Sequence, residues 1–219
     1  MKFPSLSFAN VIFVFASWGL VLIFYNQLPD SVSIHWNSSD HINGTMEKPW
    51  GALWGPLTIT FLWVLLSSLP FISPRGSRMD SFIKTWQIMV TMILGCTLLV
   101  EIIVLLKASG FSVNLAQVIP TIIGVLFIGL SNFMGKLRKN FFVGIRTPWT
   151  LSNDTAWYKT HRLGAWFLAM SGLTFIGEGV RVLPLWVPQI VLAIFIIFLI
   201  GYSYLVAKKN EAEPPEMTP

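Results

Sequence analysis

The chain alternates long apolar segments with short polar connections. An α-helix needs about 20 mostly apolar residues to cross the hydrocarbon core of a bilayer, and six segments meet this requirement. They extend over residues 7–28, 51–72, 82–106, 115–134, 163–183 and 185–207. The first segment is expected to be a retained helix rather than a cleaved signal, because it ends at Leu28-Pro29 without a small-residue cleavage site. The pattern predicts an all-α, polytopic membrane protein with six transmembrane helices.

The first connection, residues 29–50, has a short period of two. Val32, Ile34 and Trp36 alternate with polar residues, as expected for a half-buried strand. Asn43-Gly44 is a typical turn sequence. We therefore predict a short ordered loop with strand character between the first two helices, with its turn at Asn43-Gly44.

Residues 136–160 form the longest part of the chain that is not hydrophobic, and the run Gly144–Leu151 within it has neither a helical nor a strand period. Pro148 drives Thr147 toward an extended conformation, and Trp149 suits the lipid headgroup region. We predict that residues 135–162 form a constrained interfacial loop between the fourth and fifth helices.

Polar residues at both ends of this loop are expected to bond to helix ends. Asn132 can bond the free backbone groups at the end of the fourth helix. A cap for the next helix is expected at Ser152, Asn153 or Asp154. On that helix, spacings of four and three place Trp157, His161 and Gly164 on one side. For His161 we expect a packed or hydrogen-bonded role rather than titration near neutral pH.

The composition excludes an ordinary soluble domain. Hydrophobic residues make up 54% of the 219 residues and charged residues 11%, whereas about a quarter of the residues in soluble domains are charged. The single cysteine, Cys96, lies in an apolar segment, so an intramolecular disulfide is excluded. We expect one membrane domain over residues 1–210 and a disordered acidic, proline-rich tail over residues 211–219.

The cations predict the orientation, because Lys and Arg in short loops favour the cytoplasmic side. If the N-terminus is cytoplasmic, that side holds most of the 15 Lys and Arg residues, and only Lys48, Lys107 and Arg181 lie outside. Both termini and residues 135–162 would then be cytoplasmic, and residues 29–50 extracellular. The net charge of +5 is explained by this asymmetry and by anionic membrane lipids, so no nucleic-acid partner is expected.

Two carboxylates lie inside predicted spans, where a charge is costly and therefore a functional candidate. Glu101 and Glu178 lie at similar depths in the outer halves of the third and fifth helices. Arg181 follows Glu178 by three residues, which allows an ion pair on one helix face. In one interpretation both acids are structural, with Glu178 paired to Arg181 and Glu101 neutralised by Lys107 or Gln117.

In the other interpretation, the acids belong to a polar vestibule that opens to the outside and receives a ligand. Its candidate residues, from the first loop and from the two helices, are His35, Trp36, Asp40, Glu101, Glu178 and Arg181. The sequence leaves these two interpretations open.

The sequence predicts neither a metal site nor a cofactor. His35 and His41 lie in one loop without a cysteine, and His161 is on the opposite side of the membrane in the predicted topology, so no three-ligand set forms locally. The chain also lacks a nucleophile-elbow, zinc-protease or phosphate-loop motif. A non-enzymatic protein is expected.

The loop between the fourth and fifth helices resembles the SdpI/YfhL family of bacterial membrane proteins. The resemblance rests on Asn132, Asn140, Gly144, Ile145, Arg146, Thr147, Pro148, Trp149, Thr150, Leu151, Trp157, Thr160 and His161. The first loop, through Leu28-Pro29, the run from Ile34 to Asn37, and Lys48-Pro49, is similar to the N-terminal domain of unknown function that accompanies this family.

The resemblance implies a location in the bacterial cytoplasmic membrane and resistance to a secreted antimicrobial peptide, with recruitment of a small cytoplasmic repressor as a further role. Our leading hypothesis is an immunity or signalling protein whose vestibule meets the toxin and whose residues 136–160 present the state of the bundle to the cytoplasmic partner. The candidates for contact with that partner are Asn132, Asn140, Gly144, Arg146, Thr147, Pro148, Trp149, Thr150, Trp157 and His161.

Two other functions fit the residues less well. The two carboxylates within spans, together with Pro120 inside the fourth helix, would suit a small-solute or ion transporter. A membrane-embedded enzyme that acts on lipid or peptide is a third hypothesis.

Overall fold

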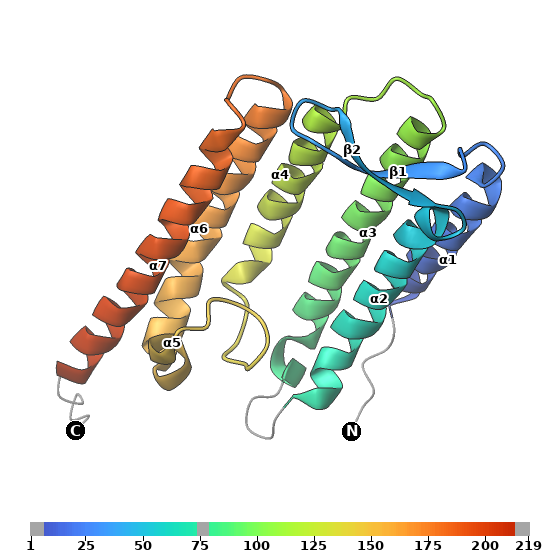
Figure 1. Cartoon of the computed structure of the whole chain (residues 1–219). Coiled ribbons are helices and arrows are strands. Elements are labelled where there is room, and N and C mark those ends of the chain that lie inside the picture. Colours follow the sequence, from blue (N-terminus) through green and yellow to red (C-terminus); the bar gives the residue numbers. More distant parts are fainter. Residues whose placement is uncertain (1–6, 74–78, 213–219) are drawn as a thin grey trace.

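The computed structural model describes residues 7–73 and 79–212, and it contains six long helices and one β-hairpin (Figure 1). In chain order the elements are α1 (Phe8–Phe24), β1 (Ser31–Trp36), β2 (Ile42–Glu47), α2 (Trp50–Ile72), a 3-10 turn η1 (Met79–Phe82), α3 (Ile83–Ala108), α4 (Leu115–Met134), α5 (Pro148–Ser152), α6 (Asp154–Gly179) and α7 (Trp186–Ala212). The predicted tail lies outside the described residues from residue 213 onward, as do the cationic residues Lys2, Arg75 and Arg78.

Four helices are long and apolar enough to cross a membrane: α2, α3 with its preceding turn, α4 and α7. Helix α1 is apolar but has only 17 residues. Helix α6 has 26 residues, but its first turns carry Asp154, Lys159 and Arg162, which lowers its hydropathy. The helical membrane architecture is therefore confirmed, whereas six crossings remain a prediction.

The long helices run alternately up and down, so the hairpin lies at one end of the bundle and the connection between α4 and α6 lies at the other (Figure 1). We call these the hairpin end and the elbow end, the elbow being residues 135–153. Helices α1, α2 and α3 pack against one another, α6 packs against both α4 and α7, and the contact between α3 and α4 joins the two groups.

Helices α4 and α6 approach so closely that their backbones touch. A Cβ atom on Gly124 would lie 2.5 Å from the carbonyl oxygen of Gly172, and a Cβ on Gly172 would lie 2.6 Å from that of Gly124. About two helical turns further along, Gly179 packs in the same way against the carbonyl of Gln117. Glycine at such positions removes the side chain that would otherwise separate two membrane helices.

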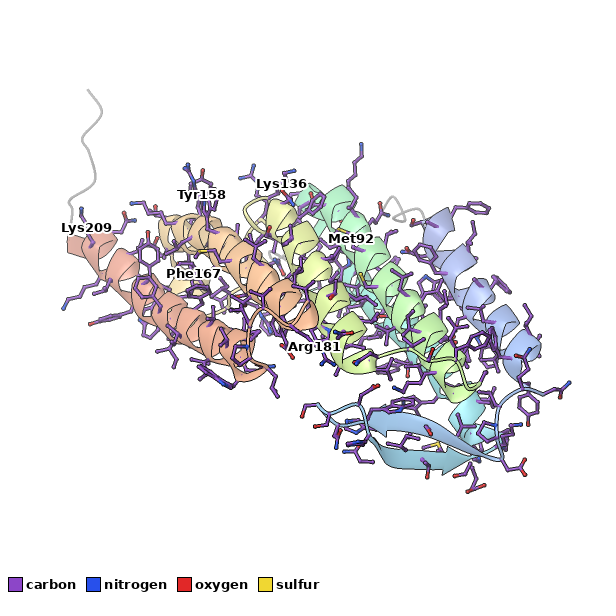
Figure 2. All side chains as sticks on the ribbon, turned by 90° about the horizontal axis from the view of Figure 1, so that it is seen from above. Met92, Lys136, Tyr158, Phe167, Arg181 and Lys209 are labelled. Carbon is purple, nitrogen blue, oxygen red and sulfur yellow. The ribbon has the colours of Figure 1, made fainter. Side chains whose placement is uncertain are left out.

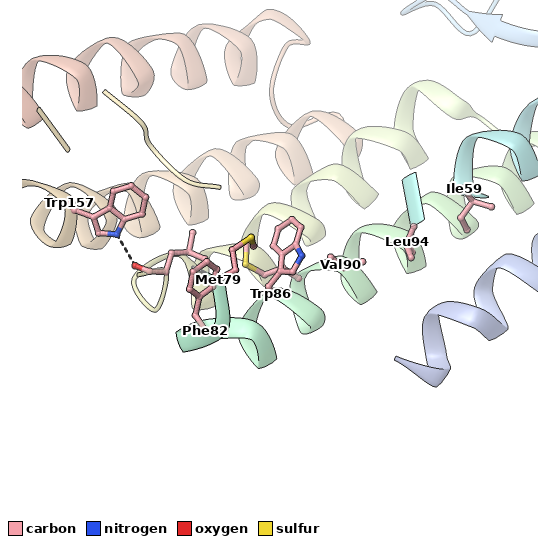
Figure 3. Packing of buried hydrophobic residues seen from close by; sticks show 9 residues of the cluster. Ile59, Met79, Phe82, Trp86, Val90, Leu94 and Trp157 are labelled. Carbon is pink, nitrogen blue, oxygen red and sulfur yellow. Dashed lines mark hydrogen bonds between the residues drawn. The ribbon is translucent and has the colours of Figure 1, made fainter. Parts of the chain in front are cut away.

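The main apolar core lies between α2 and α3 and extends to the elbow (Figure 3). Ile59 and Leu94 are fully buried within it, and Trp86 donates its indole N–H to the carbonyl of Leu66 at 3.1 Å. Trp157 of α6 belongs to the same cluster and donates to the carbonyl of Leu137 at 2.8 Å. This core therefore connects the two helix groups at the elbow end.

The predicted strand character of residues 29–50 is confirmed, but the predicted turn at Asn43-Gly44 is wrong. Both residues lie inside β2, and the turn is formed by residues 37–41 instead. The side-chain oxygen of Asn37 accepts the N–H groups of Ser39 and His41, each at 3.0 Å, and Asp40 adopts a left-handed φ of 64°. Asparagine and aspartate are the side chains that best support such a turn.

Gly44 has a different role from the turn expected for it. It lies opposite His35 at an irregular step of the ladder, where a Cβ would come within 2.9 Å of the His35 Cβ. The His35 ring also bonds to the side-chain oxygen of Asn43 at 2.5 Å. Gly44 thus permits a close cross-strand approach rather than a chain reversal.

Candidate functional site

A cavity of about 980 Å³ opens at the hairpin end between the two helix groups. Its walls come from the second half of β1 and the turn after it, from α3, from the start of α4, and from the end of α6 and the connection to α7. Five of the six candidates for an outer vestibule line it, namely His35, Trp36, Asp40, Glu178 and Arg181. The tertiary structure thus places these five residues, which come from distant parts of the chain, around one space.

Asp40 fastens the tip of the hairpin to the α3–α4 connection. One carboxylate oxygen forms an ion pair with Lys107, and the other accepts the N–H of Leu115 at 3.0 Å. Lys107 also donates to the carbonyl of Val113 at 2.8 Å. The carboxylate satisfies a free N–H group at the start of α4, so it acts as a cap supplied from another element.

The expected ion pair between Glu178 and Arg181 does not form in the part of the chain that the structure describes. Helix α6 ends at Gly179, and Arg181 has a left-handed φ of 59°, so the helical spacing that would align the two side chains is lost. The side chain of Gln189 on α7, rather than that of Arg181, interacts with the Glu178 carboxyl. Its Oε2 atom is buried without a hydrogen-bond partner.

Glu101 lies outside the cavity. It is 6% exposed and points toward α1 and α2, where Ser17 donates to its Oε2 at 2.6 Å. The Glu101 carboxyl also fills the space beside Gly55, where a Cβ would come within 2.7 Å of it. Lys107, the partner expected for Glu101, pairs with Asp40 instead. The two acids that suggested a transport path therefore occupy different environments.

The elbow is built around Asn140, which is 1% exposed. Its amide donates to the carbonyls of Arg138 and Val143 at 2.9 and 3.0 Å, and its oxygen accepts the N–H groups of Phe142 and Val143 at 2.9 and 2.7 Å. All the hydrogen-bonding capacity of one buried side chain is used to shape a short loop, as buried polar groups require.

His161 closes the elbow from the side of α6. It stacks on Trp157, with ring centroids 4.0 Å apart, and its Nε2 accepts the N–H of Ile145 at 3.0 Å. Its Nδ1 lies 2.8 Å from the Trp157 carbonyl, which assigns the proton to Nδ1. His161 precedes the apolar part of α6, and burial lowers its pKa to about 4. The packed, hydrogen-bonded role expected for this histidine is confirmed.

Gly144 makes room for His161. It has a φ of 112°, and a Cβ on it would lie 2.2 Å from the His161 Nε2. Both the backbone conformation and the close approach require glycine at this position.

A capping box follows Gly144 at the start of α5. The Thr147 side chain accepts the N–H of Thr150 at 3.2 Å, and the Thr150 hydroxyl accepts the N–H of Thr147 at 2.9 Å. Pro148 occupies the first turn, where its missing N–H costs nothing. Thr147 also bonds to Ser203 of α7 at 2.9 Å, and Trp149 packs edge-on against Tyr204. The elbow is thus attached to α7 as well as to α6.

Of the two polar caps expected on either side of the elbow, only the one at the start of α6 is observed in the described residues. Asn132 donates to the carbonyl of Ile128 at 2.8 Å, which lies inside α4, so its side chain bonds within the helix and not to a free group at the helix end. Of the three proposed capping residues, Asn153 acts, and its side chain accepts the N–H of Ala156 at 2.9 Å. Arg146 lies on the surface of the elbow and donates to the carbonyl of Phe141.

Sequence reasoning missed three partners of the site residues: Lys107 for Asp40, Ser17 for Glu101 and Ser203 for Thr147. None of these pairings carries a local signal, because each joins residues that are far apart along the chain. Residues 7–73 and 79–212 contain no group of three or more His, Cys, Asp or Glu side chains that could hold a metal ion.

Comparisons with known proteins found matches to the part of the chain that contains the hairpin and to the part that contains most of the elbow. The model of the SdpI/YfhL protein family matches residues 136–205, which include most of the elbow. A domain of unknown function, DUF1648, matches residues 12–60, which include the hairpin. Immunity protein SdpI of Bacillus subtilis (strain 168) is 24% identical over 201 residues, which cover 89% of this chain and 93% of that protein. No solved structure matches the chain. The resemblance inferred from the sequence is thereby confirmed.

Proposed function

We propose that this chain is a bacterial membrane immunity protein that protects its producer from a secreted antimicrobial peptide. The similarity to Immunity protein SdpI, which extends over 89% of the chain, carries the proposal. The proposed protein is non-enzymatic, forms one membrane domain over residues 1–210, and crosses the membrane six times with both termini in the cytoplasm. The cation asymmetry along the sequence supports this orientation.

In this proposal the cavity at the hairpin end faces outward and meets the toxin. Its volume of about 980 Å³ is at the upper end of the range of about 300–1,000 Å³ common for ligand sites. Glu178 and Arg181 line it without pairing to each other in the described structure, so neither charge neutralises the other. Asp40 is already bonded to Lys107 and Leu115 and serves to hold the hairpin over the cavity.

Survival of cells challenged with the cognate toxin tests this role. We expect Glu178→Gln to reduce protection by about tenfold or more in toxin concentration, because loss of one charge-assisted contact costs about 1.5–3 kcal/mol. Glu101→Gln is the matched control, since it makes the same chemical change outside the cavity, and it should retain protection. Equal protection by both variants, at equal membrane levels, would contradict the assignment of the cavity.

We also propose that the elbow signals to a small cytoplasmic repressor. The support is its construction: a loop held by buried Asn140 and His161 presents Arg146 on its surface next to Phe141. A loop that served only to attract lipid headgroups would need cations, but not this fixed backbone.

Recruitment of a fluorescent repressor to the membrane tests the signalling role. Arg146→Ala should reduce recruitment by about fivefold or more, within the range expected for removal of one charged interface contact. Arg162→Ala removes another exposed arginine near the same end of the bundle and should have a smaller effect. Equal losses in the two variants would show that the basic surface acts only through its total charge.

A further inference from the structure

Within the described residues the sheet consists of β1 and β2 alone, so one edge of β1 is unpaired there. Alternate residues of an edge strand direct their backbone N–H and C=O groups away from the paired neighbour. In the described chain no third strand pairs with this sheet. The free backbone groups of β1 are therefore available to another extended segment.

The cavity lies on the β1 side of the hairpin. Its lining includes Ile34, His35 and Trp36 of β1 and continues through the turn, but it includes no residue of β2. The ladder is irregular between Ser33 and His35 and between His35 and Trp36, so the strict alternation of faces is broken where these residues line the cavity. Because three consecutive residues of β1 line the space and no residue of β2 does, we place it beside β1, on the side away from β2. Figure 2 shows Arg181 close to the tip of the hairpin, and Arg181 is among the residues that line this space.

Two buried polar atoms on residues that line the cavity have no hydrogen-bond partner within residues 7–73 and 79–212: the indole Nε1 of Trp36 and the carboxylate Oε2 of Glu178. One is a donor and the other an acceptor, and unpartnered groups of this kind are costly unless a ligand or water satisfies them. A peptide offers a carbonyl oxygen for the indole N–H, and a basic side chain offers a donor for the carboxylate. Val100, Val104 and Ile119 add an apolar wall for the side chains between them.

We propose that the cavity binds an extended peptide segment that adds as a third strand to the free edge of β1 and places a basic side chain against Glu178. Backbone hydrogen bonds would supply affinity and the cavity walls would select side chains, as in other cases of strand addition. This inference rests on the proposed function, because it describes how the peptide toxin is held.

The test uses the full chain in nanodiscs of zwitterionic lipid, so that the membrane does not attract the cationic probe. The probe is a fluorescein-labelled heptapeptide of alternating threonine and valine with a central lysine, and its binding is measured by fluorescence anisotropy. We expect saturable binding. An analogue with alternate backbone amides N-methylated, and an analogue with glutamate in place of lysine, should each bind at least about tenfold more weakly, a difference of 1.4 kcal/mol.

Variants assign the contact to the cavity. Glu178→Gln should weaken binding of the lysine peptide about tenfold, whereas Glu47→Gln, the same change at an exposed site of β2 outside the cavity, should leave it unchanged. Absence of saturable binding, or equal binding of the N-methylated analogue, overturns strand addition. An unchanged affinity in Glu178→Gln overturns the role of the carboxylate.

The survival assay separates this inference from the proposed function. Protection from the toxin by a chain that fails to bind the peptides would overturn strand addition and leave the immunity role standing. Binding of the peptides by a chain that gives no protection would contradict the immunity role and leave strand addition standing.

Discussion

Replacing Gly144 by alanine is expected to open the elbow. The native φ of 112° is strained for any residue with a Cβ, and the new methyl group would lie 2.2 Å from the His161 Nε2. The strained backbone costs about 1–3 kcal/mol. Moving His161 aside also leaves the buried N–H of Ile145 without its acceptor, which costs about 1–3 kcal/mol more. We expect a fall of roughly 10 °C or more in the thermal midpoint of the purified protein, measured by size-exclusion chromatography after heating.

Two other glycines separate the causes of this effect. Gly110 has a φ of 94° with nothing within 4 Å of an added methyl group, and Gly135 has neither a left-handed backbone nor a close neighbour. Gly110→Ala should therefore show the backbone strain alone, and Gly135→Ala should show no loss. A Gly144→Ala protein as stable as Gly110→Ala would mean that the contact with His161 is not rigid.

Replacing Gly172 by leucine is expected to separate α4 from α6. The first atom of the new side chain would lie 2.6 Å from the backbone carbonyl of Gly124, and backbone cannot move aside as a flexible side chain can. Overpacking a well-packed interface costs about 1–3 kcal/mol and occasionally more. Because this contact joins two whole helices, we expect the variant to accumulate at a level several-fold lower in the membrane and to aggregate in detergent.

Gly201 provides the matched control on α7, since a Cβ there meets nothing within 4 Å. Gly201→Leu makes the same change within an apolar helix, and it should accumulate and elute like the parent protein. If both leucine variants behave alike, the α4–α6 contact is looser than the backbone distances indicate.

Helix α6 connects these stability predictions with the proposed function, because it contributes residues both to the cavity and to the elbow. It carries Glu178 near one end and His161 near the other, and the 17 intervening steps of an α-helix span about 26 Å. The candidate toxin site and the elbow are thus parts of the same rigid element. A displacement of α6 at the cavity would change the hydrogen bonds of His161 with Ile145 and of Trp157 with Leu137.

Local features of the elbow could be predicted from the sequence because their causes are local. Pro148 restricts Thr147 whatever surrounds it, and the observed extended Thr147 begins a helix there. Asn153 caps the start of α6 through the N–H of Ala156, three residues away. The spacing of Trp157 and His161 brings their rings together on one helix face.

The first loop shows where local reasoning fails. Asn43-Gly44 is a good turn sequence, yet the chain turns at residues 37–41, because Asn37 bonds to the backbone and Asp40 is held by Lys107 and Leu115. A turn signal states only that a conformation is permitted. The local bonds of Asn37, together with the contacts of Asp40 outside the hairpin, selected which of two permitted turns is used.

By itself, the sequence determined the apolar helices, the strand character of the first loop and the capped elbow, because each depends on residues a few positions apart. Only the tertiary structure decided which charges meet. Asp40 and Lys107 are 67 residues apart, and Ser17 and Glu101 are 84 apart. Such pairs depend on how whole helices pack, and backbone contacts such as that between Gly124 and Gly172 determine that packing. For this reason Glu101 and Glu178, which lie at similar depths along the sequence pattern, occupy separate environments in the bundle.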